Sequence, residues 1–98
     1  MPVIRTIRFE VQPEDMEEMI TRRNALVAAV RSGFPGLTEA RLARAGEQVW
    51  LDSWLWESSA SMDAAVQAVG AGSLPEAGPA FALIGNVIAE TAEVVDER

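Results

Sequence analysis

All three tryptophans of the chain lie at alternate positions of one short apolar segment. In a β-strand, successive side chains point to opposite faces, so Trp50, Trp54 and Trp56 share one face with a single carboxylate, Asp52. The other face is also mostly apolar, with Val49, Leu51, Ser53 and Leu55. A strand that is apolar on both faces and rich in aromatic residues is typical of the middle of a sheet that is covered on both sides.

Length and charge narrow the class of protein. The 98 residues predict one globular domain, 1–98, and the hydrophobic fraction of 49% argues against disorder. Asp and Glu number 15, whereas the 8 basic residues are all arginine, so the net charge is −7. An acidic chain of this kind disfavours binding to nucleic acid or to an anionic membrane surface.

Several chemistries are excluded because Cys, His, Lys and Tyr are all absent. Their absence rules out a thiol nucleophile, a lysine Schiff base, a Ser-His-Asp triad and the usual zinc or haem ligands, so we expect no metal and no cofactor. No segment resembles a signal peptide or reaches the length of a membrane span, and a cytoplasmic location is therefore the expectation.

Hydrophobic periodicity predicts the order strand, helix, strand, strand, helix, strand. The strands are expected at 3–11, 37–44, 48–57 and 86–95. The first helix should begin at Pro13 and close at Gly33; the second should be capped by Ser58 or Ser59 and end at Gly70, with a short helical turn at 79–84. This order indicates an α+β, ferredoxin-like βαββαβ fold, in which a four-stranded antiparallel sheet carries two helices on one face.

Two helices leave the second face of such a sheet bare. Three exposed indoles would present roughly 600 Å² of apolar surface, the upper end of what soluble monomers leave uncovered. We therefore predict a homodimer through the sheet face, with the indoles turned toward the helices. Arg5 and Arg8 belong to the first strand, and at least one should face an interior or an interface, where a salt bridge across the dimer is the expected role.

Arg23 falls near the centre of the apolar stripe of the first helix. A guanidinium facing the sheet needs an acceptor, because an unpaired buried charge costs several kcal/mol. Asp52 and Glu57 are the candidate partners. The alternative is that Arg23 lays its methylene groups on the core and carries its charged head into solvent.

The element order, the length, the turn Phe34-Pro35-Gly36-Leu37 and the strand end Trp54-Leu55-Trp56-Glu57-Ser58 resemble the antibiotic biosynthesis monooxygenase family. The resemblance implies a dimeric α/β barrel with a ligand pocket between the helices and the sheet of each subunit. Members of known activity oxidise polycyclic phenols to quinones with molecular oxygen, without metal or flavin. In them a tryptophan at the position of Trp56 lies in the pocket, and an amide four residues earlier, here Asp52, helps to hold the substrate.

If the tryptophan face lines a pocket, two residues are candidate catalytic groups. Asp52 could take a phenolic proton, and the Trp56 N–H could hold a substrate oxygen as negative charge develops. The candidate substrate-binding residues for a small aromatic ligand are Trp50, Trp54, Arg23 and Met62. Arg23 could instead pair with Asp52, and a paired Asp52 would be a poor base.

Three functions remain open from the sequence. The first is a cofactor-independent monooxygenase acting on an aromatic, polyketide-like molecule. The second is a non-catalytic dimeric small-molecule-binding or regulatory module, suggested by the absence of His, Tyr and Cys; a packed interior without a cavity above Trp56 would favour it. The third is an isomerase or cyclase in which Asp52 moves a proton without oxygen, since one fold hosts many chemistries.

Overall fold

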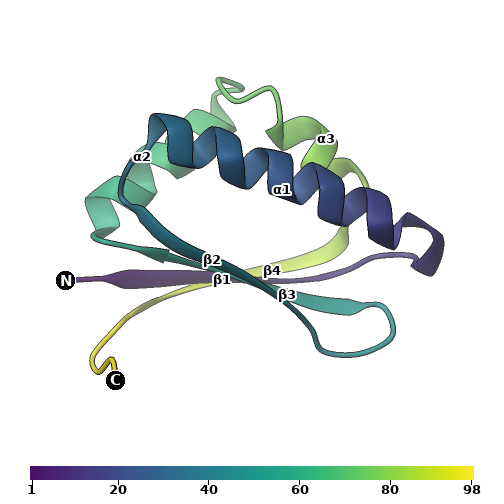
Figure 1. Cartoon of the computed structure of the whole chain (residues 1–98), viewed down its shortest axis with the longest axis horizontal. Coiled ribbons are helices and arrows are strands. Elements are labelled where there is room, and N and C mark those ends of the chain that lie inside the picture. Colours follow the sequence, from purple (N-terminus) through teal and green to yellow (C-terminus); the bar gives the residue numbers. More distant parts are fainter.

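All six expected elements form in the expected order, and the computed structural model describes all 98 residues (Figure 1). The strands are β1 (Val3–Glu10), β2 (Leu37–Arg44), β3 (Val49–Trp56) and β4 (Gly85–Glu93), and the long helices are α1 (Met16–Gly33) and α2 (Ser59–Gly70). Residues Pro13–Asp15 form a single 3₁₀ turn ahead of α1. The short helical turn expected at 79–84 is a six-residue helix, α3 (Ala77–Ala82), which begins earlier than expected.

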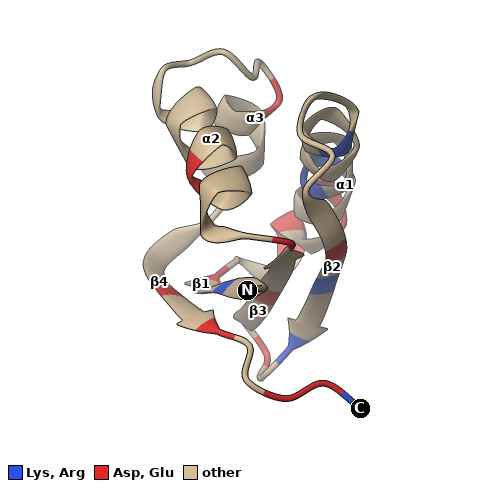
Figure 2. Ribbon diagram, turned by 90° about the vertical axis from the view of Figure 1, so that its left-hand side faces the viewer, with Lys and Arg blue, Asp and Glu red and all other residues tan.

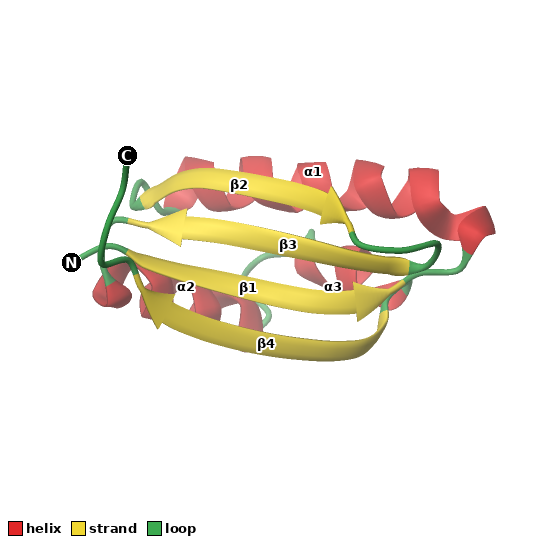
Figure 3. Ribbon diagram, turned by 90° about the horizontal axis from the view of Figure 1, so that it is seen from below, coloured by secondary structure: helices red, strands yellow, loops and turns green.

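The sheet has the strand order β2-β3-β1-β4, and each neighbouring pair is antiparallel (Figure 3). The tryptophan strand β3 is therefore an interior strand, as its composition predicted. All three helices lie on one side of the sheet, with α1 over one half and α2 and α3 over the other (Figures 1 and 2). The fold is the predicted α+β, ferredoxin-like βαββαβ fold.

The register between β1 and β3 decides which side chains share a face. Directly opposed residues of an antiparallel pair point the same way, and β3 pairs with β1 as Trp50↔Phe9, Asp52↔Ile7, Trp54↔Arg5 and Trp56↔Val3. Trp50, Asp52 and Trp56 are buried. Because the helices cover only one face, the prediction that the indoles turn toward them is confirmed.

The apolar interior between sheet and helices consists of two separate clusters. The smaller cluster is made of Phe9, Val11, Met19 and Trp50. The larger is made of Val3, Leu26, Val27, Val30, Leu37, Trp56, Met62, Ala65, Ala77 and Ala80. Trp50 and Trp56 thus anchor different clusters. Of the helix-facing residues between them, Trp54 packs against the larger cluster and Asp52 belongs to neither.

Two local features fix the start of α2 against the sheet. Ser58 is the N-cap, as one of the two expected candidates, and its hydroxyl accepts a hydrogen bond of 3.2 Å from the backbone N–H of Ser61. Gly36 lies directly against Ser61, and a Cβ at this position would collide with the serine side chain. The Gly36 carbonyl accepts a 2.9 Å hydrogen bond from the N–H of Glu57. The Phe34–Leu37 turn and the end of β3 therefore meet at a position that only glycine fits.

The opposite sheet face carries no helix (Figure 3). Register pairs Ile4 with Leu55 on this face, and Arg8 with both Leu51 and Ile88. Ile88 is 64% exposed. A single chain thus leaves an apolar strip on β1, β3 and the edge strand β4 without a covering helix. None of the helices has the length and apolar character needed to cross a membrane.

Candidate functional site

A cavity of about 480 Å³ lies between the sheet and the helices. Strands β1, β3 and β4 form its floor, α1 forms one wall, and α2 with α3 forms the other. Its lining is mostly hydrophobic: Arg5, Ile7, Phe9, Met19, Arg23, Leu26, Val30, Asp52, Trp54, Trp56, Ala65, Val66, Val69, Gly70, Ala80, Phe81, Ile84, Val87 and Ala89. Such a volume falls within the range of about 300–1,000 Å³ that is typical of small-molecule sites.

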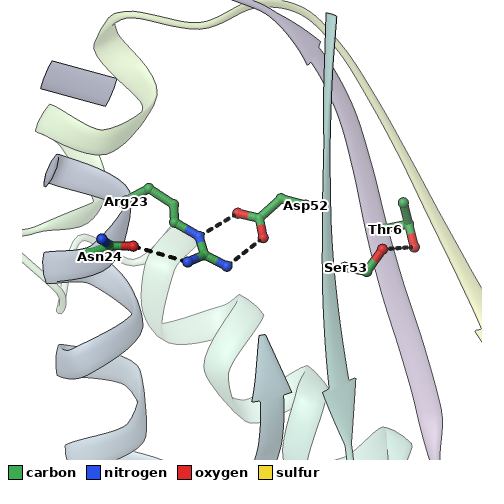
Figure 4. A network of polar contacts seen from close by, with 5 residues as sticks. All are labelled: Thr6, Arg23, Asn24, Asp52 and Ser53. Carbon is green, nitrogen blue, oxygen red and sulfur yellow. Dashed lines mark hydrogen bonds and ion pairs between the residues drawn. The ribbon is translucent and has the colours of Figure 1, made fainter. Parts of the chain in front are cut away.

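An ion pair between Arg23 and Asp52, two residues of the cavity lining, joins α1 to β3 (Figure 4). Arg23 Nε donates to Asp52 Oδ2 at 3.1 Å, and Arg23 Nη2 donates to Asp52 Oδ1 at 2.9 Å. The third guanidinium nitrogen, Nη1, donates to Asn24 Oδ1 at 3.0 Å. The exposed fraction of the Asp52 side chain is 4% and that of Arg23 is 15%, so the alternative with the arginine head in solvent is wrong. Glu57, the other candidate partner, accepts from Ser61 instead.

Figure 4 also shows why Asp52 reaches the helix. Ser53, the next residue along β3, points to the opposite face and hydrogen-bonds with Thr6 of β1 at 3.0 Å. Asp52 points toward α1, where the periodicity of the helix places Arg23. The alternation of the strand and the stripe of the helix together bring the two charges into contact.

Trp54 and Trp56 form an aromatic wall of the cavity. Their ring centroids are 6.4 Å apart and their planes are tilted by 33°. Trp56 is among the most deeply buried side chains, and its Nε1–H has no hydrogen-bond acceptor. A buried donor without a partner is uncommon and costs free energy, so an acceptor at this wall would be favourable.

Four of the six predicted site residues line one cavity: Asp52, Trp56, Trp54 and Arg23. Trp50 and Met62, expected as substrate-binding residues, lie outside its lining. Trp50 packs in the smaller core cluster beneath the guanidinium of Arg44, whose carbon lies 5.5 Å from the ring centroid. Met62 is buried in the larger cluster, where its sulfur accepts from the Thr91 hydroxyl at 4.0 Å.

Other lining residues were not assigned to a site from the sequence. In the sequence, Arg5 interrupts the apolar side of the first strand, and that interruption is the signal by which it could have been assigned to the site. Val66, Phe81 and Val87 are apolar yet 40%, 43% and 50% exposed, and they belong to the cavity lining that α2, α3 and β4 contribute. Their convergence depends on how these elements pack and has no local signature.

The arrangement suits a flat apolar ligand better than a metal ion. No group of three or more His, Cys, Asp or Glu side chains in the chain is placed to hold a metal. Indole rings stack on aromatic ligands, and the few charged groups of the cavity lining come from β1, β3 and α1.

Comparison with known proteins identifies a matching family and solved structures with the same fold. The model of the family described as antibiotic biosynthesis monooxygenase matches residues 2–72. No curated protein has a significantly similar sequence. The fold is shared with SnoaB, a cofactor-independent oxygenase from Streptomyces nogalater, at 21% identity and a TM-score of 0.72, over 98% of this chain and 95% of that one.

Two further solved structures have the same fold. Rv0793 from Mycobacterium tuberculosis is 17% identical with a TM-score of 0.72, over 99% of this chain and 98% of that one. A mutant of MhuD, solved with two manganese protoporphyrin IX molecules per active site, is 21% identical with a TM-score of 0.68, over 98% of this chain and 97% of that one. At these identities the likeness extends to the fold alone.

The ion pair predicts a non-additive effect on stability. Arg23→Met should lower the free energy of unfolding by roughly 3–5 kcal/mol, because it leaves a carboxylate buried without its partner. The double variant Arg23→Met, Asp52→Leu should regain most of that loss, as measured by chemical denaturation. Equal losses in the single and double variants would contradict the pairing.

Proposed function

The chain belongs to the antibiotic biosynthesis monooxygenase family, and on that basis we propose that it is a cofactor-independent oxygenase of a flat aromatic, polyketide-like molecule. The observation that carries the proposal is the apolar cavity walled by Trp54 and Trp56. A closely packed interior above Trp56 would have favoured a purely structural role for the indoles.

The proposed reaction needs no group beyond the substrate and oxygen. An ionised anthrone-type ring gives one electron to O₂, and the resulting radical and superoxide combine to a peroxide. Loss of water then leaves a carbonyl, so that one O₂ is consumed and one H₂O released for each CH₂ oxidised to C=O. The chain would bind and orient the ring, keep water out, and stabilise negative charge on oxygen.

Trp56 is the residue we assign to the reacting oxygen. Trp56 belongs to the cavity lining beside Trp54, and its N–H is a fully buried donor with no acceptor in the protein. A substrate oxygen on this wall would accept that hydrogen bond most strongly when it carries negative charge. Trp54 would provide a face for the ring to stack on.

Asp52 receives a different role from the general base expected from the sequence. Both of its oxygens already accept hydrogen bonds from Arg23, and removing a substrate proton would require it to weaken that pair. We assign Asp52 to positioning Arg23 at the cavity. Proton removal by Asp52 is the alternative, and a loss of turnover in a folded Asp52→Asn variant with an unchanged KM would favour it.

A porphyrin, which MhuD holds in its own structure, fits this chain poorly. The chain contains no His, Cys or Tyr to ligate the metal, and Met19 provides the one sulfur in the cavity lining. We derive no step through such a group.

A second function is favoured by one specific observation. Asp52 is the one carboxylate in the cavity lining, and it is held by Arg23. A cavity without a free base suits a module that binds a small aromatic molecule without converting it. An isomerase or cyclase would need that same carboxylate to move a proton.

The oxygenase proposal predicts oxygen uptake with an anthrone-type substrate. Trp56→Phe should reduce the rate by roughly 10- to 100-fold, because it removes the hydrogen-bond donor and keeps an aromatic ring. Trp50→Phe is the matched control and should keep the rate, since Trp50 lies outside the cavity. Equal rates in the Trp56→Phe variant would remove this residue from the mechanism, and substrate conversion under strict anoxia would favour an isomerase.

We also propose that the bare sheet face pairs with the same face of a second copy. Its strip of Ile4, Leu51, Leu55 and Ile88 is apolar and only partly covered within one chain. A twofold-symmetric contact would bury it against itself. The ligand cavity lies on the other side of the sheet, so the two surfaces do not compete.

The mass of the protein in solution tests the proposed dimer. Light scattering at micromolar concentration should give twice the chain mass of 10.6 kDa. Leu51→Arg should shift the protein toward the monomer, because it places a charge in the paired face. Ala28→Arg, on the exposed surface of α1, is the control and should stay dimeric. A monomer mass for the unaltered chain would contradict the proposal.

A further inference from the structure

The charges that line the cavity do not cancel. Three charged side chains contribute to its lining, Arg5, Arg23 and Asp52. Arg23 and Asp52 neutralise one another through two hydrogen bonds. Arg5 forms no ion pair and no side-chain hydrogen bond in the structure. One positive charge is therefore left over, inside a chain whose net charge is −7.

Arg5 lies at the centre of the sheet, on the face that the helices cover. Its direct partners are Trp54 on β3 and Thr91 on β4. The Thr91 hydroxyl is directed to the sulfur of Met62. The carboxylate that shares this face on β4 is Glu93, which stands opposite Val3 and forms no ion pair with Arg5.

A half-buried guanidinium beside an apolar cavity is an unusual arrangement, because charged groups removed from water are normally paired. Arginine offers a planar fork of donors that matches a carboxylate or another oxygen anion. Trp54, its partner across β3, offers the flat surface on which an aromatic ring stacks.

We propose that Arg5 is an anion-binding residue and that the ligand of the cavity is an aromatic molecule with one ionised oxygen group, a carboxylate or an ionised phenol. The guanidinium of Arg5 binds that group, and the ring lies along Trp54. This assignment rests on the proposed function in one respect, because it takes the same cavity as the ligand site and gives the ligand a charge. It does not depend on whether the ligand is oxidised.

Arg5 would also favour ionisation of the ligand, a task for which Asp52 is poorly suited because it is paired with Arg23. A neighbouring positive charge favours the ionised form of a phenol, which is the electron-rich form that reacts with oxygen. A site that selects the anion needs less help from a carboxylate base.

Two probes that differ only in charge test the inference, 9-anthracenecarboxylate and the neutral 9-anthracenecarboxamide. Binding is measured under nitrogen by quenching of tryptophan fluorescence. The unaltered protein should bind the carboxylate tighter by roughly 10- to 100-fold, in line with a charge-assisted hydrogen-bonded pair. Arg5→Met should reduce this preference to near unity, whereas Arg5→Lys should keep part of it.

Arg8→Met is the matched control, because Arg8 belongs to the same strand but faces the opposite side of the sheet beside Leu51. It should retain the full preference. If Arg5→Met does not fold, the salt dependence of the unaltered protein decides: salt at about 0.5 M should weaken binding of the carboxylate and leave the amide unchanged.

Several results would overturn the inference. They are an equal affinity of the unaltered protein for the two probes, no binding of either probe, a preference that survives Arg5→Met, and a preference that does not respond to salt. Preferential binding of the carboxylate without oxygen uptake by an anthrone would support the inference while contradicting the oxygenase proposal. The two failures are therefore distinguishable.

Discussion

The ion pair between Arg23 and Asp52 lies between two apolar clusters of the core. Trp50 belongs to the cluster on one side of Asp52 along β3, and Trp56 belongs to the cluster on the other. A carboxylate at this position cannot be packed among indoles without a partner, and the partner has to come from α1. The space beside the pair is lined mostly by apolar side chains, and it is the cavity. The division of the apolar interior and the position of the cavity are thus both connected with Asp52, the one carboxylate on the tryptophan face of β3.

The pair also decides which charge is free. Because Asp52 engages Arg23 with both oxygens, the positive charge that a ligand would meet is that of Arg5, from the neighbouring strand. Trp54 lies opposite Arg5, and Trp56 adds an N–H that no protein atom accepts. A flat wall and an unpaired cation in one apolar cavity are complementary to an aromatic anion, and the buried Trp56 N–H in that wall is an unused donor. The bare sheet face differs from the cavity because no helix covers it, and its apolar residues Ile4, Leu51, Leu55 and Ile88 lie around the exposed Arg8.

Much of this could be predicted from the alternation of one strand. It placed the indoles and Asp52 on one face, and helix periodicity placed Arg23 opposite them. Alternation fixes the face of a residue but not its depth beneath the helices, so it could not separate Trp50, which packs under Arg44, from Trp54 and Trp56 in the cavity. Helix periodicity likewise placed Met62 on the apolar stripe of α2, but it could not decide between the core and the site. Arg5 was expected inside or at an interface, and its place at the cavity depended on how far α2 and α3 stand from α1.

The three indole N–H groups give three separate NMR signals, and their response to a ligand shows directly whether this cavity is the binding site. On titration with 9-anthracenecarboxylate, we predict large shifts for the Trp54 and Trp56 signals, the latter in the direction of a newly formed hydrogen bond. The Trp50 signal should hardly move, because its ring is packed in the other cluster. A response confined to Trp50, or no response of Trp56 under saturating ligand, would contradict the assignment of this cavity as the binding site.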